Sequence, residues 1–197
     1  MPITADQVRQ LREMTGAGMM ECKKALADTA GDLEKAVDAL RKSGAAKADK
    51  RSGRSANEGR VDAYIHPGNR VGVLIEVNCE TDFVARTDEF GDLVRNVAMQ
   101  VAAAGAEYVR REDVPAERIA REREILSAQV ESGKPAAIVE KIIEGKLGRF
   151  FAEVCLLEQP YIRDDKRTVA DIVRDAAAKT GENIVVRRFS RFRLGQD

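Results

Sequence analysis

Histidine, cysteine and aromatic residues are scarce in this sequence. It has no tryptophan, one histidine and three cysteines among 197 residues, and aromatic residues make up only 5% of it. The single histidine, His66, excludes a metal site that needs two histidines. Cys22, Cys79 and Cys155 form no CxxC pair, so neither a zinc site nor a disulfide framework is indicated. We interpret all three as reduced thiols of an intracellular protein.

Long apolar runs and an excess of charge are missing as well. No stretch approaches the roughly 20 apolar residues of a membrane span, and the first residues lack the apolar run of a signal peptide. We therefore expect a cytoplasmic protein without a membrane partner. With 33 basic and 33 acidic residues the formal net charge is zero, which argues against a general binder of nucleic acids. The 44% of hydrophobic residues is typical of a folded chain.

The motifs of common active sites are also absent. The sequence has no GxxxxGK[ST] loop for nucleotide phosphates and no GxSxG nucleophile. Gly16-Ala17-Gly18 is only a G-x-G in a turn between helices, and it follows no predicted strand, as a dinucleotide site would require. We therefore expect no catalytic residue, no metal and no cofactor, and we expect surfaces that act on another macromolecule.

The first 45 residues predict a module of three short helices. Thr4 and Gln7 have the spacing of a capping box. Met19, Cys22 and Leu26 fall on one face of a second helix. A third helix is predicted by the apolar spacing of Leu33, Ala36, Val37 and Leu40, and Gly44 is expected to end it. Because so small a bundle has little core of its own, we interpret residues 1–45 as a docking module for a partner.

A basic segment follows the module. Residues 41–60 contain seven lysines and arginines against Asp49 and Glu58, and almost nothing that could be buried. We interpret residues 46–60 as a solvated, partly helical linker between two domains. An RNA-binding arm is the alternative, although no aromatic residue lies among the charges to stack on bases.

Residues 61–197 predict an α+β core in which helices pack on a small antiparallel sheet. Apolar residues alternate over 61–65 and 71–77, and the turn HPGNR between them predicts a hairpin. Helical patterns follow from Phe90 to Val101, after Pro115 with a stop at Gly133, after Pro135, and from Thr168 to Gly181. The segment VCLLEQP gives mixed signals, and ENIVVRRFSRFRLG predicts a closing strand.

Two features are unusual for a core or a plain surface. Thr81 or Asp82 could cap a helical turn and hold Phe83 at an exposed corner beside a carboxylate. In the other interpretation, which periodicity alone favours, Asp82 is only a cap and Phe83 fills the core. Met19 and Met20 are consecutive on a helix, so both could lie in the small core or one could be exposed as an adaptable contact, with Arg12 as a polar anchor nearby.

These two places resemble the signatures of the translation elongation factor Ts family. The segments are LREMTGAGMMECKKAL at residues 11–26 and EVNCETDFVAR at residues 76–86. The likeness continues through KSGAAKA, HPGNRVGVL, SGKP, LLEQP and GENIVVRR, and so covers nearly the whole chain. Longer members of the family have two core subdomains and a coiled-coil insertion. This chain has room for one core unit, so it resembles the short form.

The resemblance implies a guanine-nucleotide exchange factor for elongation factor Tu, which makes and breaks no bond and is not an enzyme in that sense. It implies a ubiquitin-associated-like three-helix bundle that docks on the partner through Arg12, Met19 and Met20. It implies a loop that enters the partner near its Mg²⁺ and phosphate site, formed by Thr81, Asp82, Phe83 and Val84.

The resemblance also bears on the core. His66 resembles, more loosely, a histidine that contacts the partner in longer members, and a plain hairpin-turn histidine is the alternative. If two core surfaces are needed, a homodimer could supply the second, and the strand around Phe189 and Phe192 is our candidate for its interface within a core and dimerisation domain at 61–197.

Two functions of other classes stay open at this point. One is a protein that binds RNA or the ribosome through residues 41–60 and the arginines at 187–193, with binding that falls steeply with salt. The other is an enzyme with an unrecognised site, which only the scattered acidic residues support.

Overall fold

A computed structural model describes residues 3–130 and 135–196. The chain forms two compact units, and each of them is assembled from three separate segments. The first unit consists of Met1–Gly59, Asn78–Phe90 and Val173–Val185, and the second of Arg60–Val77, Gly91–Ile172 and Val186–Asp197. No helix in the described ranges combines the length and the apolar character that crossing a bilayer requires.

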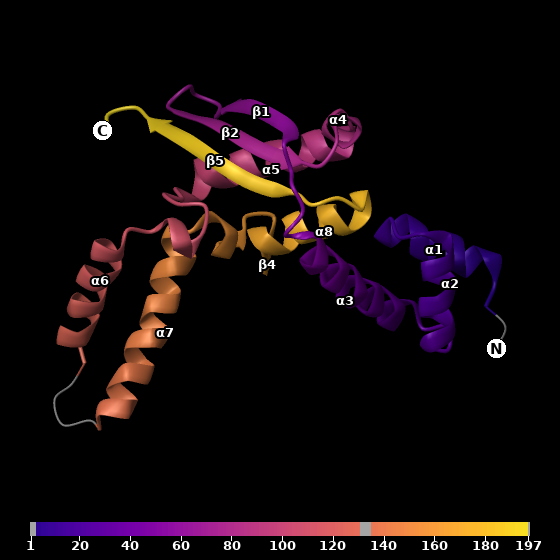
Figure 1. Ribbon diagram of the computed structural model, residues 1–197, viewed down its shortest axis with the longest axis horizontal. Coiled ribbons are helices and arrows are strands. Elements are labelled where there is room, and N and C mark those ends of the chain that lie inside the picture. The colour runs from indigo at the N-terminus through magenta and orange to yellow at the C-terminus, as the bar shows by residue number, and fades with distance from the viewer. Residues whose placement is uncertain (1–2, 131–134, 197) are drawn as a thin grey trace. The chain divides into compact units, whose positions relative to one another are not determined.

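The first unit begins with a bundle of three helices, as the sequence predicts (Figure 1). They are α1 (Ala5–Thr15), α2 (Met19–Asp28) and α3 (Leu33–Arg51). The expected capping box at Thr4 and Gln7 is confirmed, with the Gln7 amide 3.2 Å from the Thr4 hydroxyl oxygen. The core of the bundle is small: Val8, Leu11, Cys22, Ala25, Leu26 and Ala36.

The prediction that Gly44 ends the third helix is wrong, because α3 continues through it to Arg51. The strong helix formers that follow Gly44 favour this continuation. Gly44 is instead a point of close approach: a Cβ atom there would lie 3.1 Å from Cβ of Ala178 on α8 (Val169–Thr180). The glycine thus lets the two helix backbones of this unit come close together. From the sequence alone, a glycine that ends a helix and a glycine that allows close packing look the same.

The second unit contains most of an antiparallel sheet with the strand order β1-β2-β5, which confirms the α+β class. The strands are β1 (Glu58–Ile65), β2 (Val71–Cys79) and β5 (Val185–Arg193). The predicted hairpin is confirmed by the His66 amide, which donates to the Val71 carbonyl at 2.9 Å. The closing strand β5 pairs with β2, and just beyond their ends the Leu194 amide donates to the Arg70 carbonyl at 2.9 Å.

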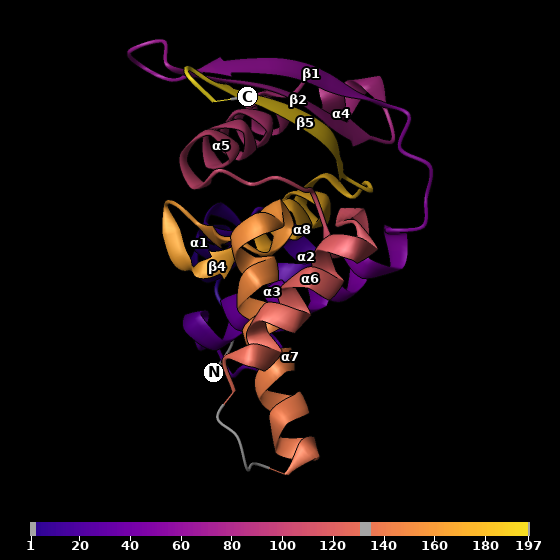
Figure 2. The ribbon, with the colours of Figure 1, turned by 90° about the vertical axis from the view of Figure 1, so that its left-hand side faces the viewer.

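Helix α5 (Asp88–Ala104) lies along one face of this sheet (Figures 1 and 2). Alternate residues of β2 are buried on that face, namely Val73, Ile75 and Val77. Arg191 of β5 reaches the same side, where its guanidinium donates to the Ala102 carbonyl of α5 at 3.4 Å.

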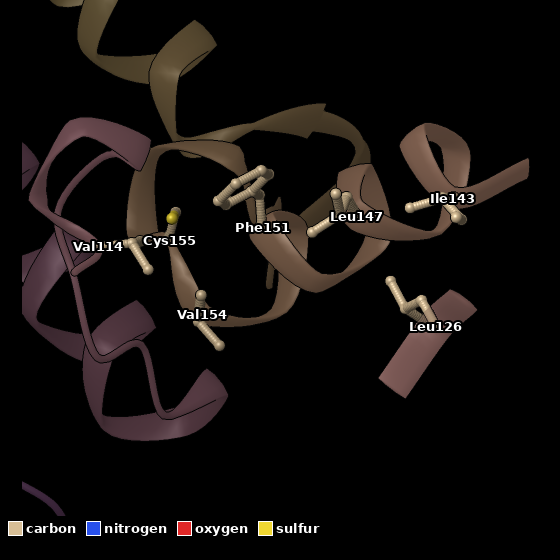
Figure 3. Close-up of a cluster of buried hydrophobic side chains, with 7 residues drawn as sticks. All are labelled: Val114, Leu126, Ile143, Leu147, Phe151, Val154 and Cys155. Carbon is tan, nitrogen blue, oxygen red and sulfur yellow. The ribbon is translucent and has the colours of Figure 1, made fainter. Parts of the chain in front are cut away.

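Two further helices pack side by side in the second unit (Figures 1 and 2). They are α6 (Ala116–Ala128) and α7 (Ala136–Val154), and the predicted prolines, Pro115 and Pro135, are their N-caps. Figure 3 shows the cluster that joins them to the preceding loop: Val114, Leu126, Ile143, Leu147, Phe151, Val154 and Cys155. Gly133, the predicted stop, lies outside the described residues.

The segment with mixed signals is a connection of short elements. The backbone of Cys155 pairs with that of Tyr108 in an isolated parallel β-bridge. The 3-10 turn η2 (Leu156–Glu158) and strand β3 (Pro160–Tyr161) follow. Strand β3 pairs with β4 (Asp164–Thr168), which the sequence does not predict, and a 3-10 turn η1 (Arg111–Asp113) precedes α6. Helix α8 begins where expected, with Thr168 and Asp171 bonded to each other's backbone amides.

We expect Leu147→Ala to destabilise the second unit by about 2–5 kcal/mol, because it leaves a cavity in the cluster of Figure 3. Leu147 is only 3% exposed. Ile138→Ala on the same helix is the matched control, because Ile138 is 50% exposed and its truncation leaves no cavity. Urea unfolding followed by tyrosine fluorescence measures both, since Tyr64, Tyr108 and Tyr161 all belong to this unit. Equal midpoints for the two variants would contradict the packing.

Candidate partner-binding site

Among the residues that the structure describes, Phe83 is the most exposed of the large apolar side chains. It lies on α4 (Asp82–Ala85), directly after β2, and it is 79% exposed. The interpretation in which Phe83 fills the core is therefore wrong. Ala85 on the same turn is buried, and so is Phe90 a little further on, so the turn is anchored on one side and presents Phe83 on the other.

The cap of α4 is Thr81, one of the two residues expected there. Its hydroxyl oxygen accepts from the Val84 amide at 3.4 Å. Asp82 forms an ion pair with Arg86 at 2.8 Å, one turn further along the helix. Thr81, Asp82, Phe83 and Val84 thus form one compact feature, a carboxylate and an exposed aromatic ring on a capped helical turn.

Glu182 holds the chain that enters α4. Its carboxylate accepts from the backbone amides of Glu80 and Thr81 at 3.0 and 3.1 Å and from the Thr81 hydroxyl at 2.6 Å. Cys79 is buried beside this carboxylate and donates to the Thr81 carbonyl at 3.2 Å. Burial, and then the charge of Glu182, raise the pKa of the Cys79 thiol. Cys79 is therefore a structural thiol rather than a nucleophile.

The second part of the candidate site is the junction of α1 and α2. Arg12 is exposed in the last turn of α1, and Met19 and Met20 are 60% and 74% exposed at the start of α2. The alternative that places both methionines in the small core is wrong, because neither belongs to the core of the bundle and Met19 is the first residue of the helix.

Met14 is a residue that sequence reasoning missed. It is 58% exposed on α1, two residues after Arg12. Its spacing of three from Leu11 is that of a core residue, so the apolar pattern hides it. Three exposed methionines thus lie within seven residues around the junction of α1 and α2, and we call them the methionine surface: Met14, Met19 and Met20. Flexible methionine side chains suit an adaptable apolar contact.

His66 belongs to the second unit. It is exposed at the start of the hairpin turn, and its Nδ1 lies 3.1 Å from the Tyr64 hydroxyl. All other predicted contact residues lie in the first unit: Arg12, Met19, Met20, Thr81, Asp82, Phe83 and Val84.

A second exposed apolar surface lies on the sheet face opposite α5. Ile65 covers Gly72, since a Cβ atom at Gly72 would lie 3.1 Å from its Cδ1 atom. Leu74 shares the face of Gly72 because side chains alternate along a strand. The members of this open sheet face are 49 to 72% exposed: Val61, Ile65, Leu74 and Phe192.

The strand β5 places Phe192 on the same face. Arg188 donates to the Glu76 carboxylate at 2.7 Å across the two strands. Glu76 is two residues from Leu74, and Phe192 is four residues from Arg188, so all of these side chains point to one side of the sheet. Phe189 lies on the other, partly buried side.

Acidic partners surround several of the basic residues in the candidate RNA-binding segments. Lys47 pairs with Glu21, Arg54 with Glu80 and Arg188 with Glu76. A cation that already faces a carboxylate attracts a phosphate less strongly. Among the described residues, no group of three or more histidine, cysteine, aspartate or glutamate side chains could hold a metal ion.

An exposed aromatic ring beside a carboxylate, together with a methionine surface, is typical of a protein that binds another protein. Comparison with known proteins gives the family. Residues 47–196 match the family model "Elongation factor TS". The chain is 60% identical to "Elongation factor Ts" of Carboxydothermus hydrogenoformans and 61% identical to that of Moorella thermoacetica, over 98% of this chain and 90% and 96% of those proteins. It is 55% identical to that of Herpetosiphon aurantiacus over the full length of both. The chain belongs to the elongation factor Ts family.

We expect Phe83→Ala to leave the free energy of unfolding within about 0.5 kcal/mol of the original, because an exposed side chain contributes little to the core. Phe90→Ala is the matched control: Phe90 is 1% exposed, and its truncation should cost about 3–5 kcal/mol. Thermal unfolding followed by circular dichroism compares the two. A similar loss of stability in both variants would mean that Phe83 packs in the core after all.

Proposed function

We propose that this chain is a guanine-nucleotide exchange factor that binds elongation factor Tu during translation elongation in the cytoplasm. The observation that carries the proposal is Phe83, 79% exposed on a rigid turn beside Asp82. A large exposed aromatic residue costs solubility, and a protein that keeps one on a fixed support uses it for contact. Membership of the elongation factor Ts family supports the identity of the partner.

Exchange follows from insertion of Phe83 into the partner. A GTPase holds its nucleotide largely through backbone amides around the phosphates and through Mg²⁺. A wedge that separates the elements supporting this site binds best when the nucleotide is absent. By linkage, whatever binds the nucleotide-free form more tightly weakens the nucleotide by the same factor. The factor therefore needs no bond chemistry and no cofactor, and GTP later displaces it.

Asp82 adds polar contacts that fix the inserted loop. Its carboxylate pairs with Arg86 at 2.8 Å and is still 44% exposed, so it can also accept from donors of the partner. Thr81 and Val84 frame the turn on either side of the ring. His66, on the hairpin of the second unit, is a further contact residue in this proposal.

The three-helix bundle is the docking module of this proposal, with a ubiquitin-associated-like fold at residues 1–45. Arg12 supplies a bidentate polar contact, and the methionine surface beside it adapts to an apolar patch of the nucleotide-binding domain. Residues 46–60 link the module to the core. In a binding site with these two parts, the docking residues mainly set the affinity for the partner, and the Phe83 wedge mainly sets the rate at which the nucleotide is released.

Release of labelled GDP from elongation factor Tu in a stopped-flow instrument tests the proposal. We expect the chain to accelerate release, and we expect Phe83→Ala to lower the stimulated rate about thirty-fold, the equivalent of about 2 kcal/mol for the loss of a central aromatic contact. Ile162→Ala is the matched control, because Ile162 is 47% exposed but lies far along the chain in the second unit.

Three results would count against the proposal. Release at the spontaneous rate in the presence of the chain contradicts exchange activity. Equal rates for the Phe83 variant and its parent contradict the wedge. Binding that disappears with rising salt and follows the arginines at 187–193 would favour the RNA-binding alternative instead.

We further propose that the core acts as a homodimer joined through the open sheet face. A single three-stranded sheet covered by helices on one side leaves its other side as an apolar surface: Val61, Ile65, Leu74 and Phe192. A second copy of this face is the partner it fits, since two sheets that pack face to face bury both surfaces. The Arg188–Glu76 pair at 2.7 Å would border that interface with balanced charge.

Leu74→Asp should convert the dimer to a monomer, because Leu74 lies on the central strand of the face. Burying an unpaired carboxylate costs about 2 kcal/mol or more, which raises the dissociation constant about thirty-fold. Sedimentation velocity at micromolar protein measures the change. Ile125→Asp on α6 is the control, since Ile125 is 45% exposed and lies outside the face. A parent that sediments as a monomer, or a Leu74 variant that stays dimeric, would contradict the interface.

A further inference from the structure

Helix α4 is too short to fix the direction of Phe83 by itself. It has four residues, and isolated helices of fewer than about 12 residues are marginal in water. The orientation of the ring must therefore come from contacts outside the helix. The loop that follows α8 supplies them, about a hundred residues further along the chain and within the same unit.

We propose that Glu182 is a positioning residue, which holds Phe83 in the direction required for nucleotide exchange by ordering the Thr81 cap. The proposal rests on the exchange function proposed above. A carboxylate only accepts hydrogen bonds, and a hydroxyl has one proton to give. Since the Thr81 hydroxyl donates to Glu182 at 2.6 Å, its lone pairs are left to accept from the Val84 amide. Glu182 thus fixes the orientation of the Thr81 hydroxyl, so that its oxygen faces the Val84 amide.

The same carboxylate also orders the backbone that leads into the cap. It accepts from the amides of Glu80 and Thr81, the two residues before α4, at 3.0 and 3.1 Å. Three donors from two adjacent residues converge on one side chain, so neither the peptide plane nor the hydroxyl of the cap can turn alone. Charge-assisted hydrogen bonds of this kind are about twice as strong as neutral ones.

Asn183 connects this support to the end of helix α3. Its backbone amide donates to the Glu80 carboxylate at 2.6 Å. Its side-chain amide donates both protons, to the carbonyls of Ser52 and Arg54 at 3.2 and 2.7 Å, and the residue is only 6% exposed. Arg54 closes the network with an ion pair to Glu80 at 3.5 Å.

The network therefore joins the chain leaving the three-helix bundle to the turn that holds Phe83. All of its members belong to the first unit, in which the methionine surface also lies. Docking through α1 and α2 thereby defines where the ring is presented. A loosened Glu182 contact leaves docking intact but lets the ring sample other directions, so fewer encounters proceed to release.

The test compares Glu182→Ala and Glu182→Gln with the parent in stopped-flow GDP release from elongation factor Tu. We expect Glu182→Ala to lower the saturating rate about ten-fold, the equivalent of one charge-assisted contact, and to change the half-saturating concentration less than about three-fold. Glu182→Gln should recover part of the rate, because its amide oxygen still accepts from the two backbone amides.

A double-mutant cycle separates positioning from a general loss of structure. If Glu182 acts through Phe83, Glu182→Ala has no further effect on release in the Phe83→Ala background. Asp113→Ala is the matched control: Asp113 is also a carboxylate that accepts from a backbone amide, that of Arg110 at 3.1 Å, but it belongs to the turn η1 of the second unit and not to the proposed binding residues. It should lower the melting temperature and leave the saturating rate unchanged.

Hydrogen–deuterium exchange keeps the inference separate from the proposed function. The amides of residues 80–85 should exchange faster in Glu182→Ala than in the parent, whether or not the chain acts on elongation factor Tu. A parent without effect on GDP release overturns the proposed function. An active parent whose Glu182→Ala variant releases GDP at the parent rate, or slows release equally in the Phe83→Ala background, overturns the positioning role alone. Unchanged exchange of these amides overturns it as well.

Discussion

A helix of four residues cannot hold itself in place, and the candidate site depends on how the fold deals with that constraint. Helix α4 is fixed at its first turn by the Thr81 cap and on one side by buried Ala85. The hydrogen bonds to Glu182 then order the cap itself. These hydrogen bonds thereby hold the exposed ring of Phe83 in place without the buried surface that a longer helix would need.

Local signals in the sequence were sufficient for most elements. The capping box at Thr4, the prolines that begin α6 and α7, the hairpin turn at His66 and the pair Thr168–Asp171 all act within a few residues, and each is confirmed. The α+β class follows from them. The candidate turn at residues 81–84 was also visible, because a threonine before Asp-Phe-Val is a strong capping signal.

The features that escaped prediction depend on contacts between distant parts of the chain. Gly44 looks like a helix stop, and only the presence of Ala178 against it shows a packing role. Met14 has the spacing of a core residue but lies outside the bundle core. Glu182 is 101 residues away from Thr81, and nothing in its local sequence indicates that it accepts hydrogen bonds there. Burial and long-range pairing are properties of the fold, so no local pattern encodes them.

The division of each unit among three segments has a consequence for how the chain folds as it is synthesised. The bundle can form early, since its contacts lie within residues 3–51. Strand β5, with its pairing to β2, and the loop containing Glu182 lie near the end of the sequence. Neither unit can complete its packing before that last part leaves the ribosome. The contacts of each unit join distant segments, so all of those segments must be available before the long loops between them can close. The turn that bears Phe83 is then ordered late, only after nearly the whole chain has been made.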